Sequence, residues 1–104
     1  MDIPVEKCPV EEAIRIIGGK WKLLVLRSLL LNGPQRYNDL LKTVTAISPK
    51  ELTRNLRALT KAGLVARPSG TGINVRYELT SLGKELMPTF NKLLVWGKKL
   101  IASA

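Results

Sequence analysis

The sequence predicts a mainly α-helical protein that carries one small antiparallel β-hairpin. Several segments repeat apolar residues every three or four positions, which is the spacing of one face of a helix. Two short β-prone segments lie close together in the second half, on either side of a glycine-containing stretch at residues 68–73. The length of 104 residues allows one hydrophobic core, and the apolar fraction of 45% is ordinary for a folded domain.

The first part of the chain predicts three helices and a very short strand. Pro9 suits a first helical position, and Gly18–Gly19 ends the helix that it opens. A second helix, apolar on most sides, is expected from about Lys20 to Leu31. Residues 35–37 then predict a very short strand, and Asn38 is the expected cap of a short third helix.

The next helix has the clearest signals for both of its ends. Ser48 and Glu51 form the pattern of a capping box, in which each side chain binds the backbone of the other residue, and Pro49 occupies the first helical position. Gly63 fits the left-handed position that follows a helix. These signals predict a helix over about residues 49–62.

Two strands and a final helix complete the expected order. Strands are predicted at residues 65–67 and 74–79. Thr80 caps a helix expected over 81–101, and Pro88 should kink this helix because proline removes one backbone hydrogen bond. The order helix, helix, short strand, helix, helix, strand, strand, helix is that of a winged helix-turn-helix.

The composition narrows the function. Seventeen basic and eight acidic residues give a formal charge of +9, and the acids are concentrated in the first twelve positions. Such a basic body predicts a polyanionic partner, most simply nucleic acid, although an acidic membrane surface would also suit it. No secretory signal or membrane-spanning run is visible, so a cytoplasmic, soluble protein without a membrane partner is expected.

The absence of histidine and the presence of one cysteine exclude several kinds of site. A Cys/His zinc site, a Cys–His or Ser–His catalytic pair and an intrachain disulfide cannot be built from this chain alone. We therefore expect no enzymatic activity, no metal and no cofactor.

The outer face of helix 49–62 is the leading candidate for a binding surface. Its members recur at steps of three and four, opposite the leucines of the same helix, and include four cations but no acid. A helix with this front can enter a major groove and donate hydrogen bonds to bases or phosphates. The alternative is a merely solvated helix face. The residues on this face are Lys50, Thr53, Arg54, Arg57 and Lys61, with Ser48 holding the helix start.

Arginines outside this helix extend the candidate surface. Arg67 and Arg76 bracket the hairpin, from which they could reach the minor groove or backbone phosphates, although an ordinary surface hairpin is an equally good interpretation. Arg36 precedes the third helix and is a further candidate phosphate anchor. The full candidate DNA-binding set is Arg36, Ser48, Lys50, Thr53, Arg54, Arg57, Lys61, Arg67 and Arg76.

The last helix is more apolar than a small domain can use internally. Two apolar stripes run along it, and a helix that is apolar on two sides usually packs against a second surface. In a chain of this length that surface is expected to be another copy of itself; a plain core helix is the alternative. The candidate interface residues, which include one from the first helix, are Ile14, Met87, Phe90, Leu94, Trp96 and Ile101.

The single cysteine, Cys8, lies at the start of a helix, where the helix dipole favours the thiolate. This placement makes it a candidate redox sensor, and a structural, inert cysteine is at least as good an interpretation. Any disulfide that it forms must join two chains or a small thiol.

Blocks spread over residues 8–100 resemble the HxlR-type regulators, which are relatives of the MarR winged-helix proteins. The blocks are Cys8–Val10, Ile17–Leu26, Arg36–Leu40, Ile47–Thr53, Ala62–Val65, Val75–Tyr77, Leu79–Gly83 and Trp96–Gly97. The hairpin departs from the family pattern, because it is about two residues shorter, lacks a Pro-Pro pair and has Arg76 where an acid is common. Contacts made by the hairpin are therefore less secure than those of helix 49–62.

The resemblance implies a homodimeric transcription factor that binds a pseudo-palindromic operator in double-stranded DNA. It places helix 49–62 in the major groove, residues 35–79 in the helix-turn-helix and wing, and residues 8–18 and 81–101 in dimerisation helices, all within one domain spanning 1–104. In some members a cysteine matching Cys8 senses quinones, aldehydes, hypochlorite or disulfide stress. The hypothesis is a sequence-specific DNA-binding regulator, with a winged-helix module that binds an acidic protein as the alternative; no small-molecule effector is identified.

Overall fold

The computed structural model describes residues 8–67 and 75–104, and these form a winged helix-turn-helix. The antiparallel strands β1 and β2 pair Val65 with Leu79 and Ala66 with Glu78. Gln35 bridges Tyr77 and so adds a one-residue third strand at the root of the wing. The elements are α1 (Pro9–Ile17), α2 (Lys20–Asn32), α3 (Tyr37–Thr43), α4 (Pro49–Lys61), β1 (Val65–Ala66), β2 (Glu78–Leu79), α5 (Ser81–Lys84) and α6 (Met87–Ala102).

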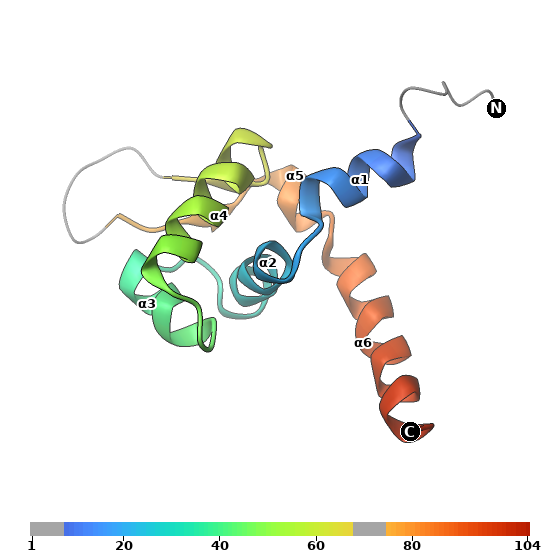
Figure 1. The fold of residues 1–104 in the computed structure, drawn as a ribbon. Coiled ribbons are helices and arrows are strands. Elements are labelled where there is room, and N and C mark those ends of the chain that lie inside the picture. Colours follow the sequence, from blue (N-terminus) through green and yellow to red (C-terminus); the bar gives the residue numbers. More distant parts are fainter. Residues whose placement is uncertain (1–7, 68–74) are drawn as a thin grey trace.

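The core lies where α2 meets α3, α4 and the two strands. Leu26 of α2, Leu40 of α3 and Leu59 of α4 are completely buried there. Figure 1 shows α3, α4 and the strands on one side of α2, whereas α1 and α6 project from the other side. The fold thus separates the helix-turn-helix and wing from the two terminal helices.

The predicted signals at the ends of α4 are largely confirmed. The Ser48 hydroxyl accepts from the Glu51 N–H at 3.1 Å, and Pro49 occupies the first turn. Gly63 has φ +80°, the left-handed conformation that favours glycine, and the Leu64 N–H donates to the Leu59 carbonyl. The expected second bond of the capping box, from the Ser48 N–H to the Glu51 carboxylate, is replaced by one that Arg54 donates to the same carboxylate.

A ring of three hydrogen bonds fixes the root of the wing against α2 and α3. The Ser28 hydroxyl donates to Thr43 at 2.7 Å, the Thr43 hydroxyl donates to the Gln35 side-chain oxygen at 2.8 Å, and the Gln35 amide donates back to Ser28 at 2.9 Å. The Gln35 backbone also exchanges hydrogen bonds with Tyr77. Because Gln35 and Ser28 are buried, this ring provides the partners that buried polar groups require.

The start of α3 differs from the prediction. The helix begins at Tyr37, so Asn38 is not its cap and residues 35–37 supply only the Gln35 bridge. The Arg36 N–H donates to the Asp39 carboxylate at 3.1 Å, which satisfies a backbone donor ahead of the first turn. The side-chain contact at this helix start is therefore made by Asp39 of the first turn, not by Asn38.

The expected single helix over 81–101 is divided into α5 and α6, with the break at residues 85–86. The prediction of a kink at Pro88 inside one helix was therefore wrong. Pro88 lies in the first turn of α6, where the missing N–H costs little, and its ring is incompatible with the carbonyl four residues earlier, that of Lys84. Lys84 is the last residue of α5.

The strands are shorter than the predicted 65–67 and 74–79, because only two residues of each are paired in β1 and β2. Asn74 and the expected hairpin tip at 68–73 lie outside the described residues. Among the described helices, none has the length and apolar character needed to cross a membrane.

Candidate nucleic-acid interface

The two faces of α4 have opposite character. Leu52, Leu56 and Leu59 are buried on the inner face. The cations on the outer face are exposed, and Thr53 lies half-buried among them. Asn55 belongs to the inner side, because it is buried and its amide donates to the Glu51 carbonyl at 2.6 Å. The exposed cations of this outer face are Lys50, Arg54, Arg57 and Lys61.

One carboxylate reaches the edge of this basic face. Arg54 Nη2 lies 2.5 Å from Glu51 Oε2, so the Arg54 guanidinium is held by an acid on its own helix. No acid was predicted on this side, because the capping-box pattern places the Glu51 carboxylate at the helix start. Arg54 must share or exchange this partner when it contacts an anion, whereas Arg57 has no ion pair among those found in the described residues.

Tyr37 joins the first turn of α3 to the first turn of α4. Its hydroxyl donates to the Pro49 carbonyl at 2.8 Å and lies 2.9 Å from the Thr53 hydroxyl. Tyr37 was not among the predicted site residues. The only feature of the sequence that could have indicated a role for Tyr37 is a phenol beside a predicted helix start. Its contact with α4 depends on the angle at which α3 meets α4, which the sequence does not show.

Arg67 brings the wing to the basic face of α4. It lines a hollow of about 460 Å³ together with Arg57 and Lys61, beside the rings of Tyr37 and Tyr77. A single phosphate group in this hollow would therefore have three cations from two elements around it. The grouping supports Arg67 as a continuation of the surface that α4 presents.

A second hollow, of about 450 Å³, continues the basic surface toward α3. Arg36, Lys42 and Arg67 line it, together with Asp39. Lys42 was not among the predicted site residues, and its only sequence signal was a basic residue near the end of a short helix. Arg67 belongs to both hollows and so connects the cations of α3 with those of α4.

Arg36 and Asp39 form an exposed ion pair at the start of α3. The Arg36 Nε lies 3.3 Å from the Asp39 carboxylate. Hydrogen bonds from the Arg36 side chain and backbone lower the pKa of the Asp39 carboxyl below its ordinary value. The Asp39 carboxylate therefore compensates part of the charge that Arg36 could offer to a phosphate.

Arg76 is exposed, but it lies between two residues that line the second hollow, Val75 and Tyr77. In an extended segment the middle side chain points away from the side shared by its neighbours. The described part of the wing thus supports Arg67 more strongly than Arg76.

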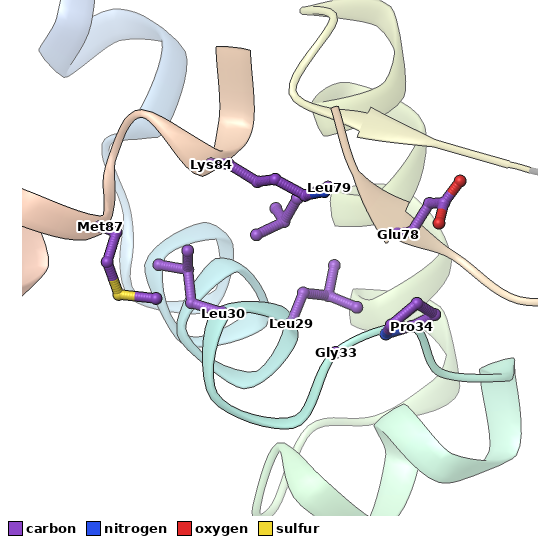
Figure 2. Close-up of a pocket in the computed structure, with 8 residues that line it drawn as sticks. All are labelled: Leu29, Leu30, Gly33, Pro34, Glu78, Leu79, Lys84 and Met87. Carbon is purple, nitrogen blue, oxygen red and sulfur yellow. The ribbon is translucent and has the colours of Figure 1, made fainter. Parts of the chain in front are cut away.

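A different hollow lies between α2, β2, α5 and the start of α6 (Figure 2). Its volume is about 400 Å³, and Leu29, Leu30, Leu79 and Met87 contribute most of its apolar wall. It marks the joint between the core and α6. The described residues contain no group of three or more acidic or cysteine side chains that could hold a metal ion.

The apolar side chains of α6 are largely exposed. Trp96 is 59% exposed and Ile101 is 79% exposed. Phe90 differs from the other predicted interface residues, because it is half-buried and packs against the core of its own protomer. On α1, Ile14 is exposed and Cys8 is a free, half-buried thiol just before the first turn. The remaining predicted interface residues, Met87 and Leu94, are also exposed.

Comparisons with known proteins agree with this architecture. A family model described as HxlR-like helix-turn-helix matches residues 16–104. YkvN of Bacillus subtilis, an uncharacterized HTH-type transcriptional regulator, is 40% identical over 92 residues, which are 86% of this chain and 77% of that protein.

Two solved structures with similar folds are a quinone-bound protein and an oxidized redox regulator. Quinone-bound YodB from B. subtilis has a TM-score of 0.77 and 30% identity, covering 88% of this chain and 99% of that chain. The redox regulator HypR in its oxidized form has a TM-score of 0.76 and 33% identity, covering 88% of this chain and 96% of that chain.

Proposed function

The chain belongs to the HxlR-like helix-turn-helix family of transcriptional regulators, and we propose that it acts as a homodimer on a pseudo-palindromic site in double-stranded DNA. In this proposal α4 of each protomer lies in a major groove, and the wing contacts the neighbouring backbone. Residues 35–79 bind DNA, and the terminal helices join the two protomers. The proposal places its action in the cytoplasm.

One observation carries the proposal of DNA contact: the leucine face of α4 is buried, so its cationic face is the one that remains free. Because the leucine face anchors α4 to the core, the opposite face can enter a groove while the helix keeps its packing. Its lysines and arginines offer only hydrogen-bond donors, which suit guanine O6 and N7 and the phosphate oxygens.

The residues divide into two groups by their expected targets. Residues on the outer face of α4 are expected to contact base edges or adjacent phosphates. They are Lys50, Thr53, Arg54 and Arg57. Four further residues are expected to serve mainly as phosphate anchors: Arg36, Lys61, Arg67 and Arg76. The second hollow adds Lys42 to them. Ser48 holds the start of α4 through the Glu51 amide.

A homodimer is supported by the exposed apolar side chains of α1 and α6. Water solvates a contiguous apolar surface poorly, and a second copy of the same face covers it most simply. The proposed interface includes Ile14, Met87, Leu94, Trp96 and Ile101, with Phe90 contributing from its half-buried position. The two α4 helices are then expected about 34–36 Å apart, one turn of duplex.

We further propose that Cys8 couples DNA binding to oxidants. The thiol lies just before the first turn of α1, within the proposed interface, and two structural neighbours are a quinone-bound protein and an oxidized redox regulator. Diamide treatment should yield a Cys8-dependent dimer band on non-reducing electrophoresis or a mass adduct on Cys8, and neither in Cys8→Ser. If the wild-type protein yields neither, the thiol is structural.

The proposal is tested by selecting genomic fragments with the purified protein and titrating the selected duplex by fluorescence anisotropy. If the dimer neutralises about 6–10 phosphates, its affinity should fall by roughly 10³–10⁵ between 50 and 200 mM salt. Equal binding to every duplex, or tighter binding to an acidic polypeptide than to any duplex, would favour the protein-interaction module instead.

A further inference from the structure

We propose that Thr53 is a specificity-determining residue that accepts, rather than donates, a hydrogen bond in the major groove. Each protomer would then favour an amino-bearing base, adenine or cytosine, on the strand that Thr53 faces. Tyr37 is the positioning residue that sets this polarity. The inference rests on the proposed function, because it requires α4 to lie in a major groove.

The polarity follows from counting hydrogens. The Tyr37 hydroxyl has one hydrogen, and the Pro49 carbonyl, 2.8 Å from it, can only accept. Tyr37 therefore uses its hydrogen on Pro49. The Thr53 hydroxyl lies 2.9 Å from the same Tyr37 oxygen, so the hydrogen between them must come from Thr53. Thr53 is left with lone pairs and no free hydrogen.

Thr53 is the neutral acceptor within a row of donors. Lys50, Arg54 and Arg57 share its face of α4 and carry donors only. The nearby acceptor, the Glu51 carboxylate, is bound to Arg54 at 2.5 Å. An acceptor held among donors in this way reads a different base from the one that its neighbours read.

The major groove supplies the matching donors. Adenine presents its N6 amino group and cytosine its N4 amino group, whereas guanine and thymine present O6 and O4 acceptors at the corresponding positions. Each base pair contains one amino base and one keto base. An acceptor-only hydroxyl therefore distinguishes the orientation of a base pair, A·T from T·A or C·G from G·C.

Removing the Tyr37 hydroxyl should relax this choice without a general loss of binding. In Tyr37→Phe the Thr53 hydroxyl regains a free hydrogen and can donate to a keto base as well as accept from an amino base. A residue with a merely structural role would weaken binding to all sequences alike. The distinguishing readout is therefore the base preference at one position rather than the overall affinity.

The experiment begins with selection of a preferred site by the wild-type protein from random duplex DNA. Affinities are then measured for all single-base-pair variants of that site with wild type, Thr53→Val, Thr53→Ser and Tyr37→Phe. The position at which Thr53→Val changes the preference identifies the base that Thr53 faces. Far-UV circular dichroism and binding to the selected site confirm that each variant is folded.

At that position wild type and Thr53→Ser should favour the amino base by about 2- to 10-fold, the range expected for one hydrogen bond. Tyr37→Phe should lower this preference to about twofold or less. Replacing the base by an analogue without the amino group, purine for adenine or 2-pyrimidinone for cytosine, should weaken binding by wild type and leave Thr53→Val unaffected.

Three results overturn the inference while leaving the proposed function intact: a keto-base preference at that position, no position altered by Thr53→Val, or an amino-base preference that Tyr37→Phe leaves undiminished. Failure of the wild-type protein to select any duplex refutes the proposed function, and the inference with it.

Discussion

Helices α4 and α6 are both amphipathic, yet they leave opposite faces free. In α4 the apolar side is buried in the protomer, with Leu59 fully enclosed, and the free side is cationic. No residue of α6 is buried to the same degree, and its exposed side chains include Leu94, Trp96 and Ile101. Water solvates the free side of α4 well and that of α6 poorly.

This difference assigns the two helices to different partners. A charged free face suits a polyanion, and an apolar free face suits a matching apolar face. Figure 1 shows α4 and α6 on different sides of α2, so one partner does not obstruct the other. Each helix is therefore expected to depend on the partner that its free face indicates.

The largest effect is expected from the buried side of α4. Leu59→Ala should lower the free energy of unfolding by about 2–5 kcal/mol, because it removes a fully buried side chain and leaves a cavity. Leu94→Ala on α6 is the matched control and should change unfolding little at protein concentrations where the protomer is monomeric. Urea denaturation followed by circular dichroism measures both. Equal losses of unfolding free energy in the two variants would contradict the claim that the apolar side is buried in α4 and exposed in α6.

The exposed side of α6 should matter for association instead. Trp96→Ala should weaken the homodimer by about 2 kcal/mol, roughly 30-fold in dissociation constant, because exposed tryptophans that become buried dominate interfaces. Sedimentation at several protein concentrations measures the constant, with Lys98→Ala as the control on the same helix. A wild-type protein that stays monomeric throughout would exclude this role of α6.

A cation on the free side of α4 should matter for DNA. Arg57→Ala is expected to weaken binding to the selected duplex by about 1–3 kcal/mol, since it removes a charged donor that also borders the hollow shared with Arg67. Lys99→Ala on α6 removes the same charge far from α4 and should leave affinity nearly unchanged. An anisotropy titration compares the DNA affinities of the two variants. If both lose affinity to a similar extent, the effect comes from net charge and not from the position of Arg57.

The smallest effect is expected at Asp39. Because Arg36 lowers the pKa of the Asp39 carboxyl, the pair stabilises the fold above the ordinary carboxyl pKa of 3.8, and this contribution is lost as pH falls through the lowered value. Asp39→Asn should therefore lower the thermal midpoint slightly at neutral pH and by less near pH 2. Calorimetry at both pH values provides the check, and an identical shift at both would exclude the carboxylate as its cause.

The fold was predictable where its signals are local. Ser48, Pro49 and Gly63 specify the ends of α4 through contacts within a few residues, and the structure confirms them. A kink at Pro88 itself, which the sequence predicts, does not account for the break between α5 and α6. The steric effect of Pro88 acts one turn earlier, at Lys84.

The candidate site was predictable only as a set of residue types. The spacing of α4 indicated which cations share a face, because the helical period fixes that relationship. Arg67 beside Lys61, and Tyr37 beside Thr53, depend on how separate elements meet. The Tyr37–Thr53 contact joins residues 16 positions apart, beyond the reach of any helical period.

The most direct test is to attach a DNA-cleaving iron chelate to α4. Lys50→Cys in a Cys8→Ser background carries the reagent at the start of the exposed face, and Lys98→Cys carries it on α6 as the reference. The account predicts two clusters of major-groove cleavage from the α4 position, centred about 10 base pairs apart on the selected site. Each labelled protein is first shown by anisotropy to bind the selected duplex. In protein that binds, absence of localised cleavage from α4, or stronger cleavage from α6, would contradict the account.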